Sequence, residues 1–391
     1  MSRRAPFRFL EFFAGGGMAR LGLGPAWACV FANDVDPLKA ATYRANFGSG
    51  HLVEGDVWGL DPSALPGGAD LAWASSPCQD LSLAGPRAGL SGARSSAFWG
   101  FWRLVAALDA QGRAPGIVVL ENVAGLLSSN GGADLEAIGH AFAARGYRFG
   151  ALEIDAAAFL PQSRPRAFVV AARGPVGGLA GDEPSPFASG AVVRAVERLP
   201  ARLQQRWVWW RLAAPPPHNA PLVNLLEPDE AVRWRSEAQT AALLAQMAPL
   251  HRRRLAEAAG KDARVVAAVY RRVRVEHGRR IQRAELRVDG LAGCLRTPGG
   301  GSSRQLVLVA QGGRTRSRWL TPREGARLMG MPESYRLPAG DTAAWRVIGD
   351  GVVAPVVRHL AEHLLEPLAA AIAEAEAAKT ISGRTRLGVG A

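Results

Sequence analysis

Short apolar runs alternate with helical stretches through the first 172 residues, and this alternation restricts the fold more than any other feature of the sequence. Most of the apolar runs end in a glycine turn or a polar cluster. The runs that we expect to be strands are 7–13, 29–32, 71–75, 117–120, 147–155 and 167–172, and helical spacing is found over 37–46, 97–110 and 133–145. Alternating strands and helices place helices on both faces of a parallel sheet. The sequence therefore predicts an α/β fold with a doubly wound, mostly parallel, Rossmann-like sheet.

The positive charge of the chain is confined to its central third. Residues 191–320 hold 24 Lys and Arg against ten Asp and Glu, a net charge of +14, while the whole chain carries +13. A solvated face would be the plain interpretation, and the near absence of lysine is also what codon bias in a GC-rich genome produces. Because the excess lies in one block and consists of arginine, we favour a nucleic-acid surface.

Composition changes along the chain indicate two domains. Residues 174–190 are rich in Gly, Pro and Ala, as in a linker, and helical spacing returns over 340–377. We therefore expect one domain of residues 1–172 plus 340–377, a smaller second domain of residues 173–339, and a flexible tail, 378–391. The sequence has no charge-free run of 18 apolar residues and no signal peptide. Its three cysteines are too far apart for a disulfide framework or a CxxC metal site. We expect a soluble intracellular protein without a metal.

A glycine-rich turn, Phe13-Ala14-Gly15-Gly16-Gly17, follows the first expected strand. Glycine lets the backbone turn tightly and come close to a nucleotide-like ligand. Asp34 lies about twenty residues further on, where a carboxylate can accept ribose hydroxyls, and Asp56 follows the next short strand. Both aspartates could instead cap helices. Since no GKS/T phosphate loop follows, a nucleoside-type cofactor fits better than ATP.

Three polar clusters follow other expected strands. The first is Ser75-Ser76-Pro77-Cys78-Gln79. A lone cysteine is usually a small buried apolar residue, but a following helix start at a sheet edge would favour the thiolate of Cys78. The second is Glu121-Asn122-Val123, where a poorly solvated carboxylate could hold or donate a proton, or pair with an arginine. The third is Gln162-Ser163-Arg164-Pro165-Arg166, whose alternate residues share one face and could clamp an anion.

In this order and spacing, these residues resemble the DNA (cytosine-5) methyltransferase family. The similarity resumes at Leu320-Thr321-Pro322-Arg323-Glu324, Arg327-Leu328-Met329-Gly330 and Gly349-Asp350-Gly351-Val352-Val353. It covers about 8–171 and 291–365. The block between, about 173–290, occupies the place of the family's target-recognition region, and double-stranded DNA is the implied partner.

The resemblance implies S-adenosyl-L-methionine as cofactor and assigns roles to single residues. Cys78 would attack C6 of a flipped cytosine, and Glu121 would hold or protonate N3. Arg166, with Arg164, would position Glu121 and the cytosine carbonyl. The implied cofactor-binding residues are Phe13, Ala14, Gly15, Gly17, Asp34, Val35, Asp56, Val57, Pro77, Asp350 and Val352. The implied substrate-binding residues are Gln79, Ser82, Asn122, Gln162 and Arg296.

The chain departs from the family pattern at three positions. Met18 replaces a common glycine, Asp350 a common asparagine, and Cys294 a common threonine. None of these removes the expected nucleophile or acid, so we expect an active enzyme. A tRNA cytosine-5 methyltransferase and a catalytically silent DNA-binding protein are the alternatives. The long basic block and the absence of a Cys-Phe-Thr tripeptide disfavour the first, and the retained Cys78, Glu121 and Arg166 disfavour the second. A monomer, with a restriction endonuclease acting separately, is the expected organisation.

Overall fold

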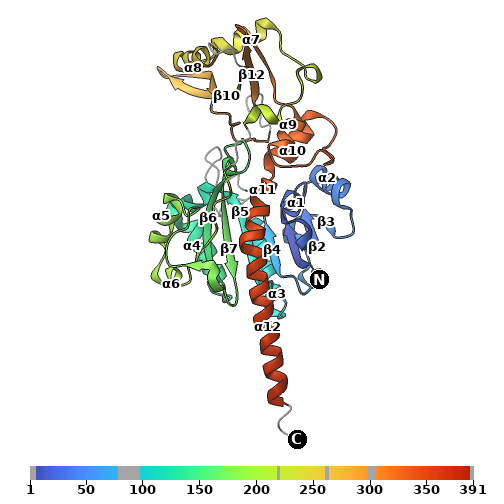
Figure 1. The fold of residues 1–391 in the computed structure, drawn as a ribbon. Helices are drawn as coiled ribbons and strands as arrows, with labels where there is room; N and C mark the ends of the chain where they lie inside the picture. Colours follow the sequence, from blue (N-terminus) through green and yellow to red (C-terminus); the bar gives the residue numbers. More distant parts are fainter. Residues whose placement is uncertain (1–5, 78–96, 218–220, 260–263, 298–303, 388–391) are drawn as a thin grey trace. The chain divides into compact units, whose positions relative to one another are not determined.

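The computed structural model describes residues 6–77, 97–217, 221–259, 264–297 and 304–387. The chain forms two compact units (Figure 1). The first unit comprises Met1–Ile154, Pro165–Pro215 and Val356–Ala391, and the second comprises Asp155–Arg164 and Pro216–Pro355.

A seven-stranded sheet forms the centre of the first unit. Its described strands are β1 (Phe7–Phe12), β2 (Trp27–Asp34), β3 (Leu52–Glu54), β4 (Leu71–Ala74), β5 (Ile117–Val123), β6 (Arg148–Asp155) and β7 (Pro165–Ala172), in the order β3-β2-β1-β4-β5-β7-β6. The β1–β2, β1–β4, β2–β3 and β4–β5 pairs are parallel, and β7 runs antiparallel to β5. The predicted mostly parallel sheet is therefore confirmed.

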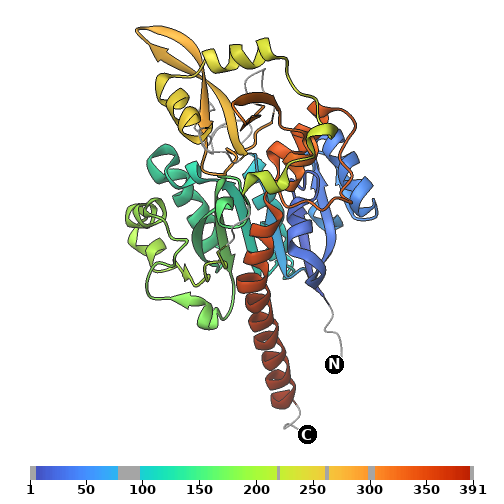
Figure 2. The same cartoon turned by 45° about the horizontal axis from the view of Figure 1, so that its top comes forward.

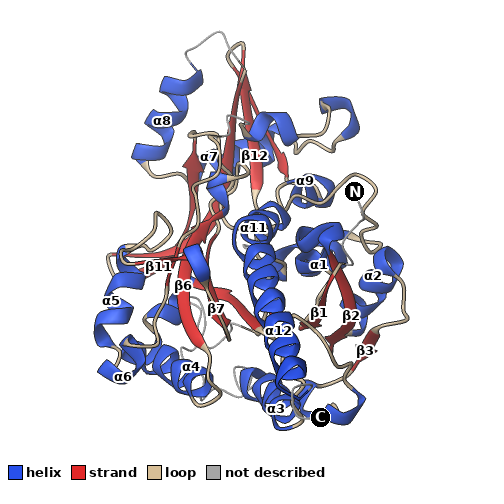
Figure 3. Ribbon diagram, turned by 60° about the horizontal axis from the view of Figure 1, so that its bottom comes forward, coloured by secondary structure: helices blue, strands red, loops and turns tan. Residues whose placement is uncertain are grey.

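Helices lie against this sheet (Figure 3), and apolar side chains of the sheet are buried. They are α1 (Met18–Leu23), α2 (Pro37–Phe47), α3 (Ala97–Ala110), α4 (Ala133–Ala143), α5 (Gly190–Arg198), α6 (Ala201–Gln204), α11 (Ala354–Leu360), which begins at the unit boundary, and α12 (Glu366–Leu387). Phe12 of β1 packs against Phe101 of α3, with ring centroids 5.0 Å apart. Because β4 is buried along its whole length, it lacks polar–apolar alternation, as expected of a central parallel strand.

The second unit is built on an antiparallel sheet of order β11-β10-β12-β13. Its strands are β10 (Val265–Glu276), β11 (Arg279–Arg287), β12 (Leu306–Gln311) and β13 (Arg314–Trp319), and its helices are α7 (Glu237–Ala245), α8 (Pro249–Ala259), α9 (Pro322–Arg327) and α10 (Asp341–Asp350). Leu243 and Met247, from α7 and the turn after it, pack with Val269, Leu286 and Leu308 of the sheet. These apolar contacts give the second unit its own core.

The unit boundaries differ from those expected from the sequence. Residues 173–215 belong to the first unit, since the Trp210 indole donates to the Val170 carbonyl (3.1 Å) and the Val208 amide donates to the Phe149 carbonyl (2.8 Å). A short pair, β8 (Ala180–Gly181) and β9 (Trp209–Trp210), also lies here. Conversely, 155–164 and 340–355 belong to the second unit. The expected flexible tail is helical as far as Leu387.

Candidate active site

The glycine-rich turn after β1 has an unusual backbone. Phe13 has φ of 57°, a conformation that costs energy for an aromatic residue and that clusters at functional sites. At Gly17 (φ 80°) a Cβ atom would collide with the Phe47 ring, so only glycine fits. At Gly15 (φ 57°) a Cβ would meet no described atom within 4 Å. The turn thus leaves open space beside the partly buried Gly15, as a ligand cradle requires.

Asp34 ties this turn to the end of β2. Its Oδ2 accepts from the Gly15 amide and its Oδ1 from the Asp36 amide, both at 2.8 Å. The side chain is buried, and burial raises its pKa. The helix-capping alternative applies instead to Asp36, whose carboxylate accepts from the Leu38 amide at the start of α2. Asp34 therefore lies beside the glycine-rich turn, and each of its two carboxylate oxygens already accepts one backbone hydrogen bond.

The second aspartate, Asp56, has the capping role that the sequence left open as an alternative. Asp56 caps a 3-10 turn by accepting from the Trp58 amide at 3.0 Å. Two neighbouring residues were also predicted to bind the cofactor. Val57, next to Asp56, is buried, and Val35, next to Asp34, is 62% exposed. Sequence reasoning missed Asn33, a buried residue whose side-chain amide donates to the Val53 and Gly55 carbonyls. It fixes the segment that carries Asp56 against β2, and the only signal for it was a polar residue directly after an apolar run.

Glu121 and Arg166 meet at the carboxyl end of β5. Because β7 is antiparallel to β5, Arg166 at the start of β7 lies opposite Val123 and close to Glu121. Arg166 Nε is 3.3 Å from Glu121 Oε1, and both side chains are largely buried. The ion pair that the sequence allowed as an alternative is thus present, and it is also the contact expected of a positioning arginine.

The segment that leads to Cys78 is bonded to the same end of β5. The buried Asn122 side chain donates to the Ser76 carbonyl and contacts the Ser76 hydroxyl, both at 3.3 Å. Pro77 follows directly. The three predicted residues Cys78, Gln79 and Ser82 lie outside the described residues.

Gln162 and Arg164 have a different setting from Arg166, because they belong to the second unit. The buried Arg164 guanidinium donates to the carbonyls of Leu295 (2.6 Å), Gly349 (2.9 Å) and Gly351 (2.7 Å). The Gln162 side chain donates to the Leu328 carbonyl and accepts from the Leu295 amide. The structure thus does not show the expected shared face of Arg164 and Arg166. It places Arg164 in contact with two backbone segments, one at Leu295 and one at Gly349 and Gly351.

The remaining second-unit residues are spread over these segments. Asp350 accepts from the Thr297 hydroxyl, Val352 is buried and Arg296 is exposed. Of the two other family departures, Cys294 lies 3.3 Å from an Arg164 nitrogen and Met18 is buried at the start of α1. The roles predicted for Asp350, Val352 and Arg296 stay predictions.

A buried polar cluster beside the glycine turn was also missed. Glu11 of β1 accepts from the Arg20 amide and the Tyr43 hydroxyl, both at 3.3 Å, and Tyr43 also contacts Cys29 and His51. Burial raises the pKa of Glu11 to about 8 and that of Cys29 to about 12. The available signal was one acidic residue inside the first apolar strand.

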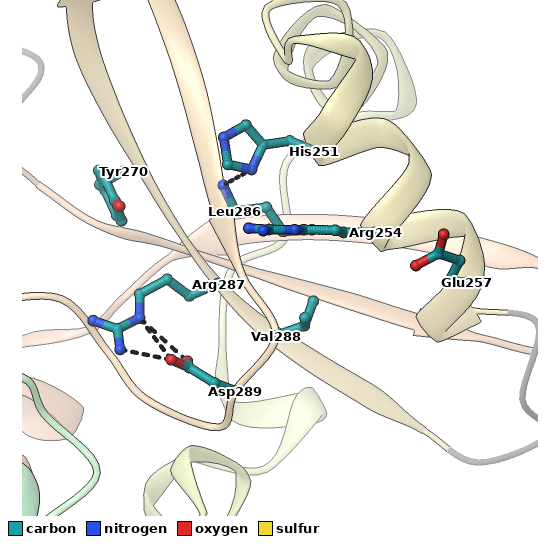
Figure 4. A pocket seen from close by; sticks show the side chains of 8 residues that line it. All are labelled: His251, Arg254, Glu257, Tyr270, Leu286, Arg287, Val288 and Asp289. Atoms are coloured by element: carbon teal, nitrogen blue, oxygen red, sulfur yellow. Dashed lines mark hydrogen bonds and ion pairs between the residues drawn. The ribbon is translucent and has the colours of Figure 1, made fainter.

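A separate hollow of about 650 Å³ lies in the second unit, between α8 and the end of β11 (Figure 4). Arg287 and Asp289 form an ion pair at its edge, and His251 accepts from the Leu286 amide. It contains none of the predicted site residues. Among the described residues, no group of three or more His, Cys, Asp or Glu is arranged to hold a metal ion.

Comparison with known proteins decides the family. Residues 7–366 match the family described as C-5 cytosine-specific DNA methylase. The chain belongs to this family. It is therefore an enzyme of DNA cytosine-5 methylation, as the motifs predicted.

Two relatives match over nearly their whole length. The type II methyltransferase M.NlaX of Neisseria lactamica is 28% identical over 374 residues, which cover 93% of this chain and 98% of that protein. The type II methyltransferase M.HhaI of Haemophilus parahaemolyticus is 26% identical over 359 residues, with coverage of 91% and 94%.

Solved structures support the fold of this C-5 cytosine methylase. The Dnmt2 methyltransferase of S. pombe superposes with a TM-score of 0.58 at 18% identity, covering 93% of this chain and 99% of that one. The Entamoeba histolytica methyltransferase EhMeth gives 0.59 at 15% identity, with the same coverage. Within the described parts of the chain, no helix has the length and apolar character needed to cross a membrane.

Proposed function

We propose that this methylase transfers a methyl group from S-adenosyl-L-methionine to C5 of one flipped cytosine in a specific duplex DNA sequence, through a covalent bond from Cys78 to C6. The observation that carries the proposal is the Glu121–Arg166 pair at the end of β5, next to the Asn122 contacts that hold the segment before Cys78. Nucleophile and acid would then approach one base from neighbouring strands. Because that base is buried in a duplex stack, it must leave the stack.

The residues around the glycine turn fit the cofactor. The open side of Gly15, the strained Phe13 backbone and the Asp34 carboxylate together form a cradle for a nucleoside. Asp34 would accept the ribose hydroxyls with its remaining lone pairs, and Asp56 would face the adenine. When bound, S-adenosyl-L-methionine supplies the electrophilic methyl group.

The protein's part of the chemistry is to make C5 nucleophilic. Attack by the Cys78 thiolate forms the S–C6 bond and moves the electrons of the C5–C6 double bond toward C5 and the ring. Glu121 holds a proton at N3 and so stabilises the developing negative charge, while Arg166 orients the Glu121 carboxyl group. After methyl transfer, loss of the C5 proton and departure of the Cys78 thiolate restore the aromatic ring.

The family match favours DNA as the partner in the organisation that we propose. Duplex DNA is the partner, a cognate restriction endonuclease would act separately, and the enzyme would work as a monomer in the bacterial cytosol. Arg296, Asp350 and Val352 are proposed to complete the substrate and cofactor contacts. Arg164 is proposed as a positioning residue.

The test is base-resolution mapping of 5-methylcytosine on mixed-sequence duplex DNA treated with enzyme and S-adenosyl-L-methionine. We expect methylation at one short recurring sequence, and none with Cys78→Ala. DNA carrying 5-fluorocytosine at that sequence should form a covalent adduct with the wild-type enzyme only. Methylation of tRNA but not of DNA would overturn the substrate assignment. Cofactor binding without methylation of either would indicate a silent binder.

A further inference from the structure

Two strands of the second unit form an arm that extends beyond the rest of their sheet. β10 pairs with β12 only from Val265 to Val269, whereas β10 and β11 remain paired as far as Glu276 and Arg279. Residues 270–285 are therefore a two-stranded ribbon, drawn in orange in Figure 2, which we call the arm. Its turn has positive φ at His277 (50°) and Gly278 (72°), as in a type I′ hairpin, whose twist matches that of the strands.

One face of the arm is occupied by ion pairs. Arg274 donates to Glu285 (2.6 Å), Arg272 lies 3.8 Å from the same carboxylate, and Arg283 pairs with Glu276. Side chains alternate along a strand, so these residues all point to one side. The charges on this side are therefore paired with one another.

The other face combines exposed apolar carbon with unpaired polar groups. We call it the valine face, and it consists of Val273 opposite Gln282 and Val275 opposite Arg280. Val273 is 50% and Val275 is 71% exposed. Gln282 and Arg280 are exposed too, and neither has a hydrogen-bond or ion-pair partner among the described residues. A strand face with such a composition has no role in the core of the unit.

We infer that the valine face of the arm enters the major groove of the target DNA and reads its bases, an inference that rests on the proposed function. A two-stranded ribbon fits the width of this groove. Glutamine pairs with adenine through N6 and N7, arginine pairs with guanine through O6 and N7, and a valine methyl packs against the thymine methyl. The basic block that contains the arm complements the phosphate backbones on either side.

Adjacent arginines on opposite faces provide a matched test. Arg279 and Arg280 are neighbours, both exposed, and removal of either changes the charge equally. Methylation rates on a library randomised around the mapped target should show that Arg280→Ala and Gln282→Ala each lose about 5–150-fold of discrimination at one base position. Arg279→Ala should keep the wild-type base preference and lose only salt-dependent affinity. Unchanged thermal unfolding would show that all three variants fold.

The outcomes separate this inference from the proposed function. If the wild-type enzyme methylates DNA but Arg280→Ala and Gln282→Ala keep its base preference, the groove assignment is wrong and the proposed function stands. Equal effects of Arg279→Ala and Arg280→Ala on affinity alone would make the arm a phosphate contact and also overturn base reading. If the wild-type enzyme methylates only RNA, both proposals fall.

Discussion

At the scale of single residues, the strand arrangement brings together Glu121 and Arg166, the pair on which the proposed reaction depends. The antiparallel β7 brings Arg166 to the end of β5, and Arg166 Nε lies 3.3 Å from the Glu121 carboxylate. Glu121→Gln keeps the shape but cannot give up or take up the N3 proton, so kcat should fall by about 10²–10⁴. Arg166→Lys should restore part of the activity that Arg166→Ala loses. Single-turnover methylation and cofactor titration check this, and a Glu121→Gln enzyme with wild-type kcat would contradict it.

A second prediction at the residue scale concerns Arg164, because its guanidinium donates to backbone carbonyls and is expected to stabilise the fold. Arg164→Ala leaves three backbone carbonyls without their buried donor, so the free energy of unfolding should fall by about 3 kcal/mol. Arg164→Lys should recover part of this loss, and Arg296→Ala, at an exposed arginine, should leave stability unchanged. Urea unfolding measures the difference. An Arg164→Ala enzyme with wild-type stability but little kcat would show a catalytic role instead.

At the scale of elements, the cluster between β1, α1, β2 and α2 makes stability depend on pH. The Glu11 carboxyl has a pKa of about 8 in the fold against the ordinary 4.5, because it is buried, with Arg20, Cys29, Tyr43, His51 and Asp34 around it. Between these pH values the folded chain keeps a proton that the unfolded chain releases. The contribution of the protonated Glu11 carboxyl group to the free energy of unfolding is complete below pH 4.5. It is lost as the pH rises to 8, by at most about 1.4 kcal/mol per pH unit.

Glu11→Gln should remove this dependence, since an amide does not titrate. Urea unfolding at pH 5, 6.5 and 8 should give a smaller loss for Glu11→Gln than for the wild type. Glu230→Gln, at an exposed glutamate of the second unit, is the control and should follow the wild type. Parallel curves for Glu11→Gln and the wild type would mean that Glu11 is ionised in the fold.

Some of these elements could be predicted from the sequence and others could not. Apolar runs and helical spacing located the central sheet, and α3 begins and ends where its pattern predicts. The sequence assigned residues 173–215 to the other domain. They join the first unit through hydrogen bonds of Trp210 and Val208 to distant strands, and such contacts produce no periodic pattern in the local sequence. The structure places Arg166 3.3 Å from Glu121, two residues that the motifs singled out, and their catalytic roles stay predictions. Asn33 and Glu11 were missed because a buried polar residue becomes meaningful only when its partners are known.

At the scale of the whole molecule, the two units carry different charges. The second unit contains 24 Lys and Arg against 14 Asp and Glu, and the first contains 23 against 20. DNA affinity should therefore depend steeply on salt, because each neutralised phosphate releases counterions. With six to ten phosphate contacts, affinity should fall about 10³–10⁵-fold between 50 and 200 mM salt. Fluorescence anisotropy on a duplex carrying the target measures this, and calorimetric titration of S-adenosyl-L-methionine in the same buffers should give nearly constant affinity. A DNA affinity that hardly changes with salt would show that the basic excess does not face the phosphates.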